Sequence, residues 1–314
     1  MPTRIGDYVV ERELGATETE LAYLGVHAIL PRRAAVKVIH PAFANARSIA
    51  LQMMREACIL EALRHPGVPH VYECGVLPDR RPWVATEHVD GTPLGTNAIP
   101  LGNVTSVLRD VAGILDHAHR RGVVHRNLRP EVILACSEQR GFSTCIVGWG
   151  DARIHDTTAP ALEPADNLHY RAPELACGGD AFDGKADVYA LGVIAHQAIT
   201  GRPPTGPVGH RNPAVPPRLG SLIDRMLEFD PNDRPSAADV RNEAIQYADA
   251  LAADDVVIEA EEVVLVDISR SPPPLPDRAK LRWTPTPHMG VPSPASRTTQ
   301  GSQSEATPSK SRRS

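Results

Sequence analysis

Apolar residues in the first ninety positions alternate with polar ones in short runs rich in β-branched side chains, a pattern typical of strands. The candidate strands cover residues 8–14, 21–27, 34–40, 68–75 and 83–89. Residues 47–64 differ, because their apolar positions recur at helical spacing and lie on one face of a helix. The residues of that face are Ile49, Met53, Ala57, Leu60 and Leu63.

Beyond Gly91 the spacing of apolar residues becomes helical. A stripe ending at Ala118 predicts an amphipathic helix, and Gly122 is a suitable residue just past its end. Residues 188–199 are apolar on nearly every side, as in a buried helix, and Gly201 closes that segment. We therefore expect an α+β fold with two lobes, a small β-rich lobe with one helix over residues 1–91 and a larger helical lobe over 92–250.

The last part of the chain, residues 251–314, has a different composition. Residues 254–268 (DDVVIEAEEVVLVDI) are acidic and apolar, and are read as an edge strand, a docked peptide or a collapsed linker. Residues 269–314 contain nine Pro, nine Ser, five Thr and eight Lys or Arg. Such a segment has little apolar surface to bury, so it is predicted to be disordered.

Charge and cysteine content exclude several classes of protein. The net charge of −5 and the pI near 6.2 argue against nucleic acid as a partner. The five cysteines include no C-x-x-C pair and indicate a reducing compartment. No apolar stretch reaches the roughly 18 residues of a membrane span, and residues 1–25 do not resemble a signal peptide. A cytoplasmic protein without membrane contact is expected.

A series of short motifs resembles the protein kinase family, in particular the bacterial Ser/Thr kinases of eukaryotic type. The resemblance covers residues 8–248 and implies the two-lobed kinase fold. Each motif alone is weak, but all stand in the family's order. They are Leu14-Gly15, Ala34-Ala35-Val36-Lys37, Arg55-Glu56, His125-Arg126-Asn127-Leu128-Arg129-Pro130-Glu131, Gly148-Trp149-Gly150, Ala172-Pro173-Glu174, Asp187 and Asp230-Pro231-Asn232-Asp233-Arg234-Pro235.

Several positions that carry the family's chemistry are occupied by other residue types. Asn127 stands at the place of the Asp that orients the attacking hydroxyl. Val132 and Gly148 stand at the two places where the family binds Mg²⁺, and neither offers a ligand atom. Arg129, a bulkier planar cation, replaces the catalytic-loop Lys. The resemblance therefore implies that no catalytic residue is competent and that no metal is bound.

The segment that resembles the phosphate-binding loop keeps one glycine, Gly15. Its backbone is therefore less able to approach phosphates, and Glu18 and Glu20 are expected to repel a triphosphate. We read this segment as a plain β-hairpin. Lys37 and Glu56 match the family's ion pair, which leaves two interpretations open: a retained nucleotide contact, or an ion pair kept for the fold.

The half of the site that resembles an adenine pocket is better preserved. Ala35 and Leu134 match its ceiling and floor, and backbone groups of Glu87 and Val89 match the hinge that binds a purine edge. Trp149 replaces a smaller ring, which raises the possibility of a blocked pocket. The resemblance also implies structural roles for other residues: a stacked column of Leu60, His125 and Trp149 anchored by Asp187, and a buried ion pair of Glu174 with Arg234.

The substitutions favour a pseudokinase that acts as a signalling or scaffold module. Its expected partner is a protein, either an active kinase or a substrate, or the chain's own basic tail. The pseudokinase would require no cofactor, with ATP bound weakly and without Mg²⁺. Two alternatives stay open: a weak or atypical Ser/Thr kinase using Asp151 or Glu131 as substitute ligands, and a nucleotide sensor without turnover. Asp151 is three residues past the family's position and is expected to point elsewhere. Ser271, Thr298 and Ser311 in the tail are predicted phosphate acceptors.

Overall fold

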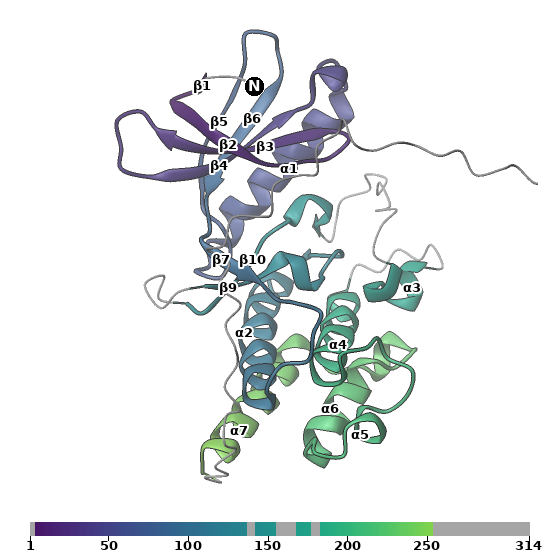
Figure 1. Ribbon diagram of the computed structural model, residues 1–314. Helices are drawn as coiled ribbons and strands as arrows, with labels where there is room; N and C mark the ends of the chain where they lie inside the picture. Colours follow the sequence, from purple (N-terminus) through teal and green to yellow (C-terminus); the bar gives the residue numbers. More distant parts are fainter. Residues whose placement is uncertain (1–3, 137–141, 155–167, 177–182, 254–314) are drawn as a thin grey trace, which may run out of the picture. The chain divides into compact units, whose positions relative to one another are not determined.

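The computed structural model describes residues 4–136, 142–154, 168–176 and 183–253. These residues belong to a unit that spans Met1–Val257. Its β-rich part and its helical part form the two predicted lobes, so the α+β fold class is confirmed (Figure 1). The predictions for residues 254–268, for the tail and for its phosphate acceptors lie outside the described residues.

The N-lobe consists of an antiparallel sheet with one long helix, α1 (Arg47–Leu63), packed against it (Figure 1). The sheet has six strands in the order β1-β2-β3-β4-β6-β5. All five predicted strands are present, and a short first strand adds an edge that the sequence pattern did not indicate. The strands are β1 (Arg4–Ile5), β2 (Tyr8–Ala16), β3 (Glu20–His27), β4 (Arg33–Ile39), β5 (Val71–Val76) and β6 (Pro82–Glu87).

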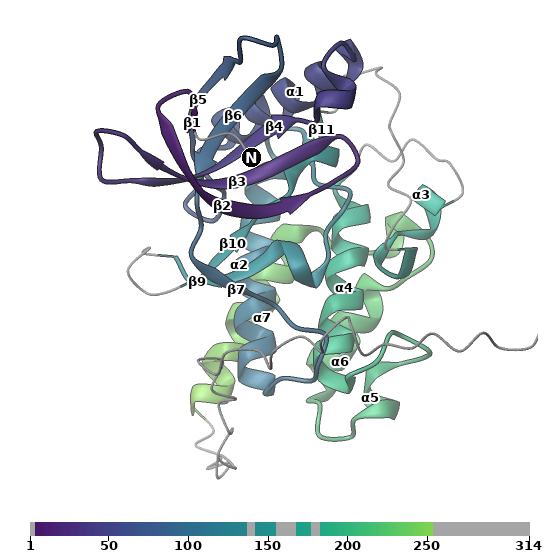
Figure 2. The same cartoon turned by 45° about the horizontal axis from the view of Figure 1, so that its top comes forward.

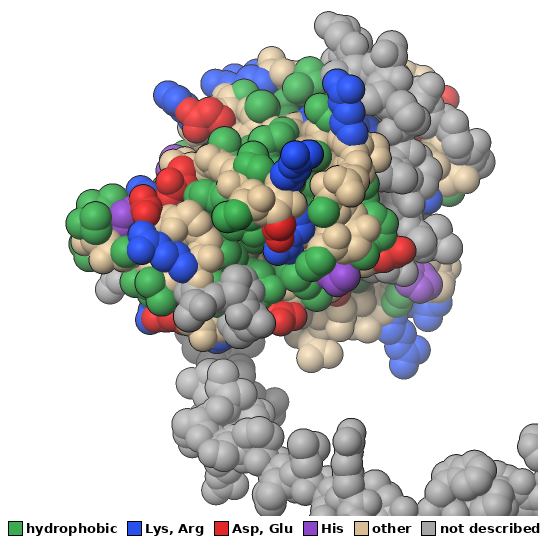
Figure 3. Space-filling model, turned by 90° about the horizontal axis from the view of Figure 1, so that it is seen from above, with side chains coloured by type: hydrophobic (Ala, Val, Ile, Leu, Met, Phe, Trp, Pro, Cys, Tyr) green, Lys and Arg blue, Asp and Glu red, His purple; other side chains and the backbone are tan. Residues whose placement is uncertain are grey.

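The two faces of this sheet have different partners because successive side chains of a strand point to opposite faces. The outer face carries a cluster that includes Tyr8 and Trp83. The inner face packs Ile39 and Val84 against Met53 of α1. Apolar side chains also appear between charged ones on the surface of this lobe (Figure 3).

Helix α1 begins at the predicted residue and ends one residue before the predicted end, and all five residues of the predicted face are buried. Its last residue is Leu63, and the C-terminal cap, Arg64, adopts a left-handed conformation with φ of 39°. The following strand begins at Val71, three residues later than predicted. The reason is a turn in which the Val68 amide donates to the carbonyl of His65. This turn brings the chain from α1 back to the sheet.

The C-lobe is built around α2 and the buried helix α4, with α7 lying along α2 (Figures 1 and 2). Gly201, with φ of 70°, terminates α4 as predicted. None of the described helices is both long and apolar enough to span a membrane. The helices are α2 (Leu101–His119), α3 (Pro173–Ala176), α4 (Lys185–Thr200), α5 (Val208–Arg211), α6 (Pro217–Met226) and α7 (Ala237–Ala253).

Two small sheets lie beside α2 and carry the segments that resemble the catalytic machinery. One has the order β10-β9-β7, and the other pairs β11 with β8. The predicted division between the lobes at residues 91 and 92 falls inside β7, which pairs with β9. The strands are β7 (Gly91–Pro93), β8 (Val123–Val124), β9 (Ile133–Cys136), β10 (Thr144–Ile146) and β11 (Arg153–Ile154).

Candidate functional site

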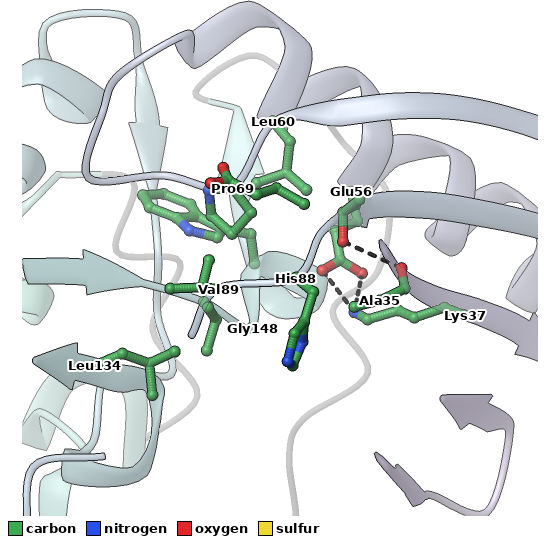
Figure 4. A pocket seen from close by; sticks show the side chains of 13 residues that line it. Ala35, Lys37, Glu56, Leu60, Pro69, His88, Val89, Leu134 and Gly148 are labelled. Carbon is green, nitrogen blue, oxygen red and sulfur yellow. Dashed lines mark hydrogen bonds and ion pairs between the residues drawn. The ribbon is translucent and has the colours of Figure 1, made fainter. Parts of the chain in front are cut away.

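A cavity of about 240 Å³ lies between the N-lobe sheet, α1 and the small sheets (Figure 4). Six of the seven residues predicted to bind a cofactor line it: Ala35, Lys37, Glu56, Glu87, Val89 and Leu134. The seventh, Gly15, is exposed near the end of β2 and does not line the cavity. The structure therefore gathers residues that are up to a hundred positions apart in the sequence.

One end of the cavity is apolar and is bounded by the hinge between the lobes. Val89 and Leu134 lie at this end, away from the Lys37–Glu56 pair (Figure 4). The Glu87 amide is used within the hinge, where it donates to the carbonyl of His70 over 2.7 Å. The Val89 amide makes no hydrogen bond to any group in the described part of the chain. It is thus the amide at which a flat heterocycle in this cavity would find a donor.

The other end of the cavity holds the Lys37–Glu56 ion pair (Figure 4). Lys37 Nζ donates to both carboxylate oxygens of Glu56, at 2.7 and 2.8 Å. Burial by itself would lower the pKa of Lys37, but the charge of Glu56, and next that of Glu20, raises it above its ordinary value. The ammonium group is therefore charged and already holds two short hydrogen bonds. Both interpretations from the sequence remain compatible with this geometry.

Glu20 approaches Lys37 from the hairpin of β2 and β3. In the register of β3 with β4, Ala22 pairs with Lys37 and Glu20 pairs with Ile39. Glu20 is therefore on the same face as Lys37, one diagonal step away. Burial, followed by the charges of Glu56 and Asp151, raises the pKa of Glu20, while Lys37 acts in the opposite direction.

The predicted hairpin reading of this segment agrees with the structure, in which the Thr17 amide donates to the Glu20 carbonyl across the turn. The two glutamates expected to repel a triphosphate are placed differently. Glu20 is half-buried beside Lys37, whereas Glu18 is exposed in the turn and is not among the charges that act on Lys37. The two side chains differ because Glu18 lies in the turn, whereas Glu20 is the first residue of β3.

Asp151 lies in the site, contrary to the expectation that it points elsewhere. Asn127 Nδ2 donates to Asp151 Oδ2 over 2.8 Å, and the charge of Asp151 also acts on Lys37. The reason is a 3₁₀ turn at Trp149–Asp151, for which Gly148 is the N-terminal cap. A 3₁₀ helix has three residues per turn, so positions three apart lie on the same side. Asp151 thus returns to the side where Gly148 has no side chain.

The two positions at which the family binds Mg²⁺ do not fit a metal ion here. Val132 is buried, and a Cβ atom added to Gly148 would lie 3.1 Å from Val132 Cγ1. The space between the positions is therefore filled by an apolar side chain, and Mg²⁺ requires oxygen ligands. Within the described residues, no cluster of three His, Cys, Asp or Glu side chains is arranged to hold a metal.

Arg129 and Glu131 extend from the same loop toward each other. Arg129 Nε lies 3.6 Å from Glu131 Oε2, and its Nη1 donates to the Asn127 carbonyl over 3.4 Å. The Glu131 side chain is 57% exposed. Glu131 is therefore paired with a cation at the surface. Of the two proposed substitute ligands, Asp151 is the one that lies beside Asn127.

The stacked column expected from the resemblance is formed. Trp149 is fully buried and meets the His125 ring edge to face, with the centroids 4.7 Å apart. Its indole N–H donates to the Ile146 carbonyl. Asp187 accepts from the His125 amide at 2.8 Å. Trp149 and Leu60 both line the cavity. The larger ring is therefore a wall of the pocket and does not block it.

Charged and histidine side chains outside the cavity make structural contacts. Arg234 and Glu174 form the expected pair, with two hydrogen bonds of 2.7 and 2.8 Å. The histidines have structural contacts: His117 Nε2 lies 2.6 Å from the Leu63 carbonyl, and His119 Nε2 lies 2.8 Å from Asp187.

Sequence reasoning missed the position of Asp151, which was assigned to the wrong side although the Gly-Trp-Gly-Asp spacing is compatible with a 3₁₀ turn that returns it. His88, which stands between the predicted hinge residues Glu87 and Val89, also lines the cavity. Burial lowers the pKa of His88, so this ring is neutral near pH 7.

Comparison with known proteins agrees with this geometry. A family profile described as protein kinase domain matches residues 8–245. The serine/threonine-protein kinase PknI of Mycobacterium tuberculosis is 32% identical over 288 residues, which cover 83% of this chain and 47% of that protein. Pkn1 of Myxococcus xanthus is 31% identical over 269 residues, covering 78% of this chain and 38% of that protein.

The fold is also found among solved structures. The crystal structure of the M. tuberculosis PknI kinase domain superposes with a TM-score of 0.60 at 28% identity, covering 77% of this chain and 97% of that domain. The present chain spans half or less of the length of the curated relatives it matches. On its motifs, its two-lobed architecture and these matches, the chain belongs to the protein kinase family.

Proposed function

We propose that this protein is a pseudokinase, a kinase-like module that does not transfer phosphate and acts by binding another protein of a signalling pathway. The observation that carries the proposal is the apolar contact between the positions of the two metal ligands. Val132 fills the space beside Gly148, so neither a carboxylate nor an amide oxygen faces that point.

The physical argument concerns charge and positioning. Phosphoryl transfer depends on neutralising the charge of the phosphates and on orienting the attacking hydroxyl. At the base position Asn127 holds no negative charge, and its amide is bound to Asp151. The loss of a positioned base typically costs about 10²–10⁴ in rate, and the loss of a metal clamp removes further stabilisation of the transition state. Such effects are not additive, but either alone makes transfer very slow.

A second candidate function rests on Asp151. Its carboxylate lies beside Asn127 and near Lys37, so an atypical kinase that uses Asp151 in place of the missing acid is the competing proposal. Against it, one oxygen of Asp151 already accepts a hydrogen bond from Asn127, and the second metal position remains Val132. The relatives named above are serine/threonine kinases, so the comparisons alone do not favour either proposal.

The test is transfer of radiolabelled phosphate from ATP to the full chain and to a generic basic protein, with Mg²⁺ and separately with Mn²⁺. We expect no incorporation above that of Lys37→Met, which controls for contaminating kinases. Asp151→Asn should be equally silent. Incorporation that vanishes in both variants while they stay folded would contradict the pseudokinase proposal and support the atypical kinase.

Restoring single residues should not rescue transfer. Asn127→Asp still lacks a metal site, and Gly148→Asp would direct a carboxylate against Val132. The triple variant Asn127→Asp, Val132→Asn, Gly148→Asp is the smallest set that replaces all three missing groups. Activity in Asn127→Asp alone would show that the metal positions are not the limiting defect.

A further inference from the structure

We propose that the cavity of this protein selects a purine base or nucleoside without phosphates, so that ATP is disfavoured relative to adenosine. This inference rests on the proposed function, since it assigns a ligand class to the same cavity. It follows from a contrast between the two ends of the cavity. The end that resembles the adenine pocket is preserved, whereas the end where the family binds the phosphates is acidic.

The acidic half is defined by three carboxylates around one cation. Glu56 holds both short hydrogen bonds of Lys37, Glu20 lies one diagonal step from Lys37 on the sheet, and Asp151 is fixed by Asn127. The four groups together carry a net charge of −2. The charges of Glu56, Glu20 and Asp151 raise the pKa of Lys37 against the effect of burial, and the pKa of Glu20 is raised first by burial and then by Glu56 and Asp151.

A phosphate that reached Lys37 would have to compete with Glu56 for the ammonium group and would meet Glu20 and Asp151 at close range. Like charges at such distances repel strongly when partly shielded from water. In the described residues, Lys37 is the one cationic side chain that lines the cavity. Arg129, from the catalytic loop, is paired with Glu131 instead. Arg153 interacts electrostatically with Asp151 but does not line the cavity, so among the described lining residues Lys37 has no second cation beside it.

The half for the base has the opposite character. Val89 and Leu134 give it apolar walls, and the Val89 amide offers a donor without a partner in the described chain. The cavity volume of about 240 Å³ lies just below the range of roughly 300–1,000 Å³ typical of sites for drug-sized ligands. It is therefore suited to a flat heterocycle better than to a complete nucleoside triphosphate.

The experiment is calorimetric titration of the full chain with adenosine, AMP and ATP, without metal and then with Mg²⁺. For the unaltered protein we expect affinity to fall in that order, with adenosine at least about tenfold tighter than ATP. In the variant Glu20→Gln, Asp151→Asn this ratio should shrink by about tenfold, while adenosine affinity stays constant. Asn at position 151 still accepts a hydrogen bond from Asn127, so the turn is retained.

Glu18→Gln is the matched control, because it removes the same charge from the same hairpin but from an exposed side chain. It should leave the ratio unchanged. ATP binding tighter than adenosine, or no adenosine binding to the folded protein, would overturn the inference. Tight ATP binding without phosphate transfer would overturn this inference and leave the pseudokinase proposal intact. Phosphate transfer would contradict the pseudokinase proposal.

Discussion

At the scale of single residues, three positions that carry the chemistry of the kinase family depart from its pattern together. Asn127, Val132 and Gly148 replace three oxygen-bearing side chains, and two separate contacts accompany these replacements. Asn127 is tied to Asp151 by a hydrogen bond, and Val132 packs toward Gly148. Restoring Asp at position 127 would therefore disturb the first contact, and an acidic side chain at position 148 would meet Val132.

The Asn127–Asp151 hydrogen bond provides a prediction at this scale. Asn127→Asp removes the donor and places two carboxylates side by side, which raises the pKa of one of them. We expect the variant to lose roughly 1–3 kcal/mol of stability at pH 7, measured by urea unfolding. The exchange variant Asn127→Asp, Asp151→Asn restores a donor and an acceptor, so it should recover most of this loss. A loss that persists in the exchange variant would show that the hydrogen bond does not stabilise the turn.

At the scale of elements, helix α1 is held at the cavity by two side chains that are one helical turn apart. Glu56 binds Lys37 of β4, and Gln52 Nε2 donates to the Gly150 carbonyl in the 3₁₀ turn over 3.4 Å. A Cβ atom on Gly150 would lie 3.5 Å from Glu56 Oε2, so the turn passes close to the helix. The helix, the sheet and the turn are therefore fixed relative to each other by polar contacts in addition to packing.

The turn after α1 makes the protein sensitive to acid. His65 Nδ1 accepts from the Gly67 amide, and the ring lies against His117 of α2, with centroids 4.7 Å apart. Burial, followed by the positive charges of His117, Arg121 and Arg241, lowers the pKa of His65 to about 4 from its ordinary 6.5. The unfolded chain therefore binds this proton at a higher pH than the folded one.

The contribution of the neutral His65 ring to the free energy of unfolding should be fully present above pH 6.5 and should decrease as the pH falls toward 4. His65→Asn keeps an acceptor for the Gly67 amide but does not titrate, so the variant should lose less stability than the unaltered protein between pH 7 and 4.5. Urea midpoints at both pH values measure this difference. His210→Asn, at an exposed site on α5, is the control and should follow the unaltered protein. Equal slopes for His65→Asn and the control would contradict the assignment.

At the scale of the described unit, the two lobes are connected through the column of Leu60, Trp149 and His125. Trp149 has the central place, since it is fully buried, contacts His125 and belongs to the turn beside α1. Asp187 of α4 anchors the column through the amides of His125 and Arg126. Burial would raise the pKa of Asp187, but hydrogen bonding and charge from His119 lower it. The anchor is thus ionised near pH 7.

Removing the central ring should weaken the whole unit. Trp149→Ala is expected to cost about 3–5 kcal/mol, and hydrogen exchange should rise in α1 and α4 together because both contact the column. Trp149→Phe loses the hydrogen bond to Ile146 and part of the ring, for which about 1–3 kcal/mol is expected. Trp83→Phe, on the outer face of the sheet, is the control. In this variant we expect faster hydrogen exchange only in the N-lobe sheet. An increase confined to one lobe in Trp149→Ala would contradict a connecting role.

The sequence by itself determined the five longer strands of the N-lobe and the helices α1, α2 and α4, in the right order. Apolar spacing placed α1 and α4 to within a few residues, because burial of one face dictates that spacing locally, whereas β1 and the short strands β7 to β11 were not indicated. The family assignment and the replaced residues at positions 127, 132 and 148 were also readable, since motif order and residue identity need no coordinates. The cavity-lining set was largely predicted through the resemblance.

Tertiary structure alone decided how Glu20 and Asp151 lie relative to Lys37. Glu18 and Glu20 looked equivalent in the sequence, and only the register of β3 with β4 put Glu20 beside Lys37. Asp151 was expected to point away, and the 3₁₀ turn returned it to Asn127. The physical reason is that electrostatic contacts depend on side-chain direction within a few ångströms, whereas the burial pattern depends only on the period of the element.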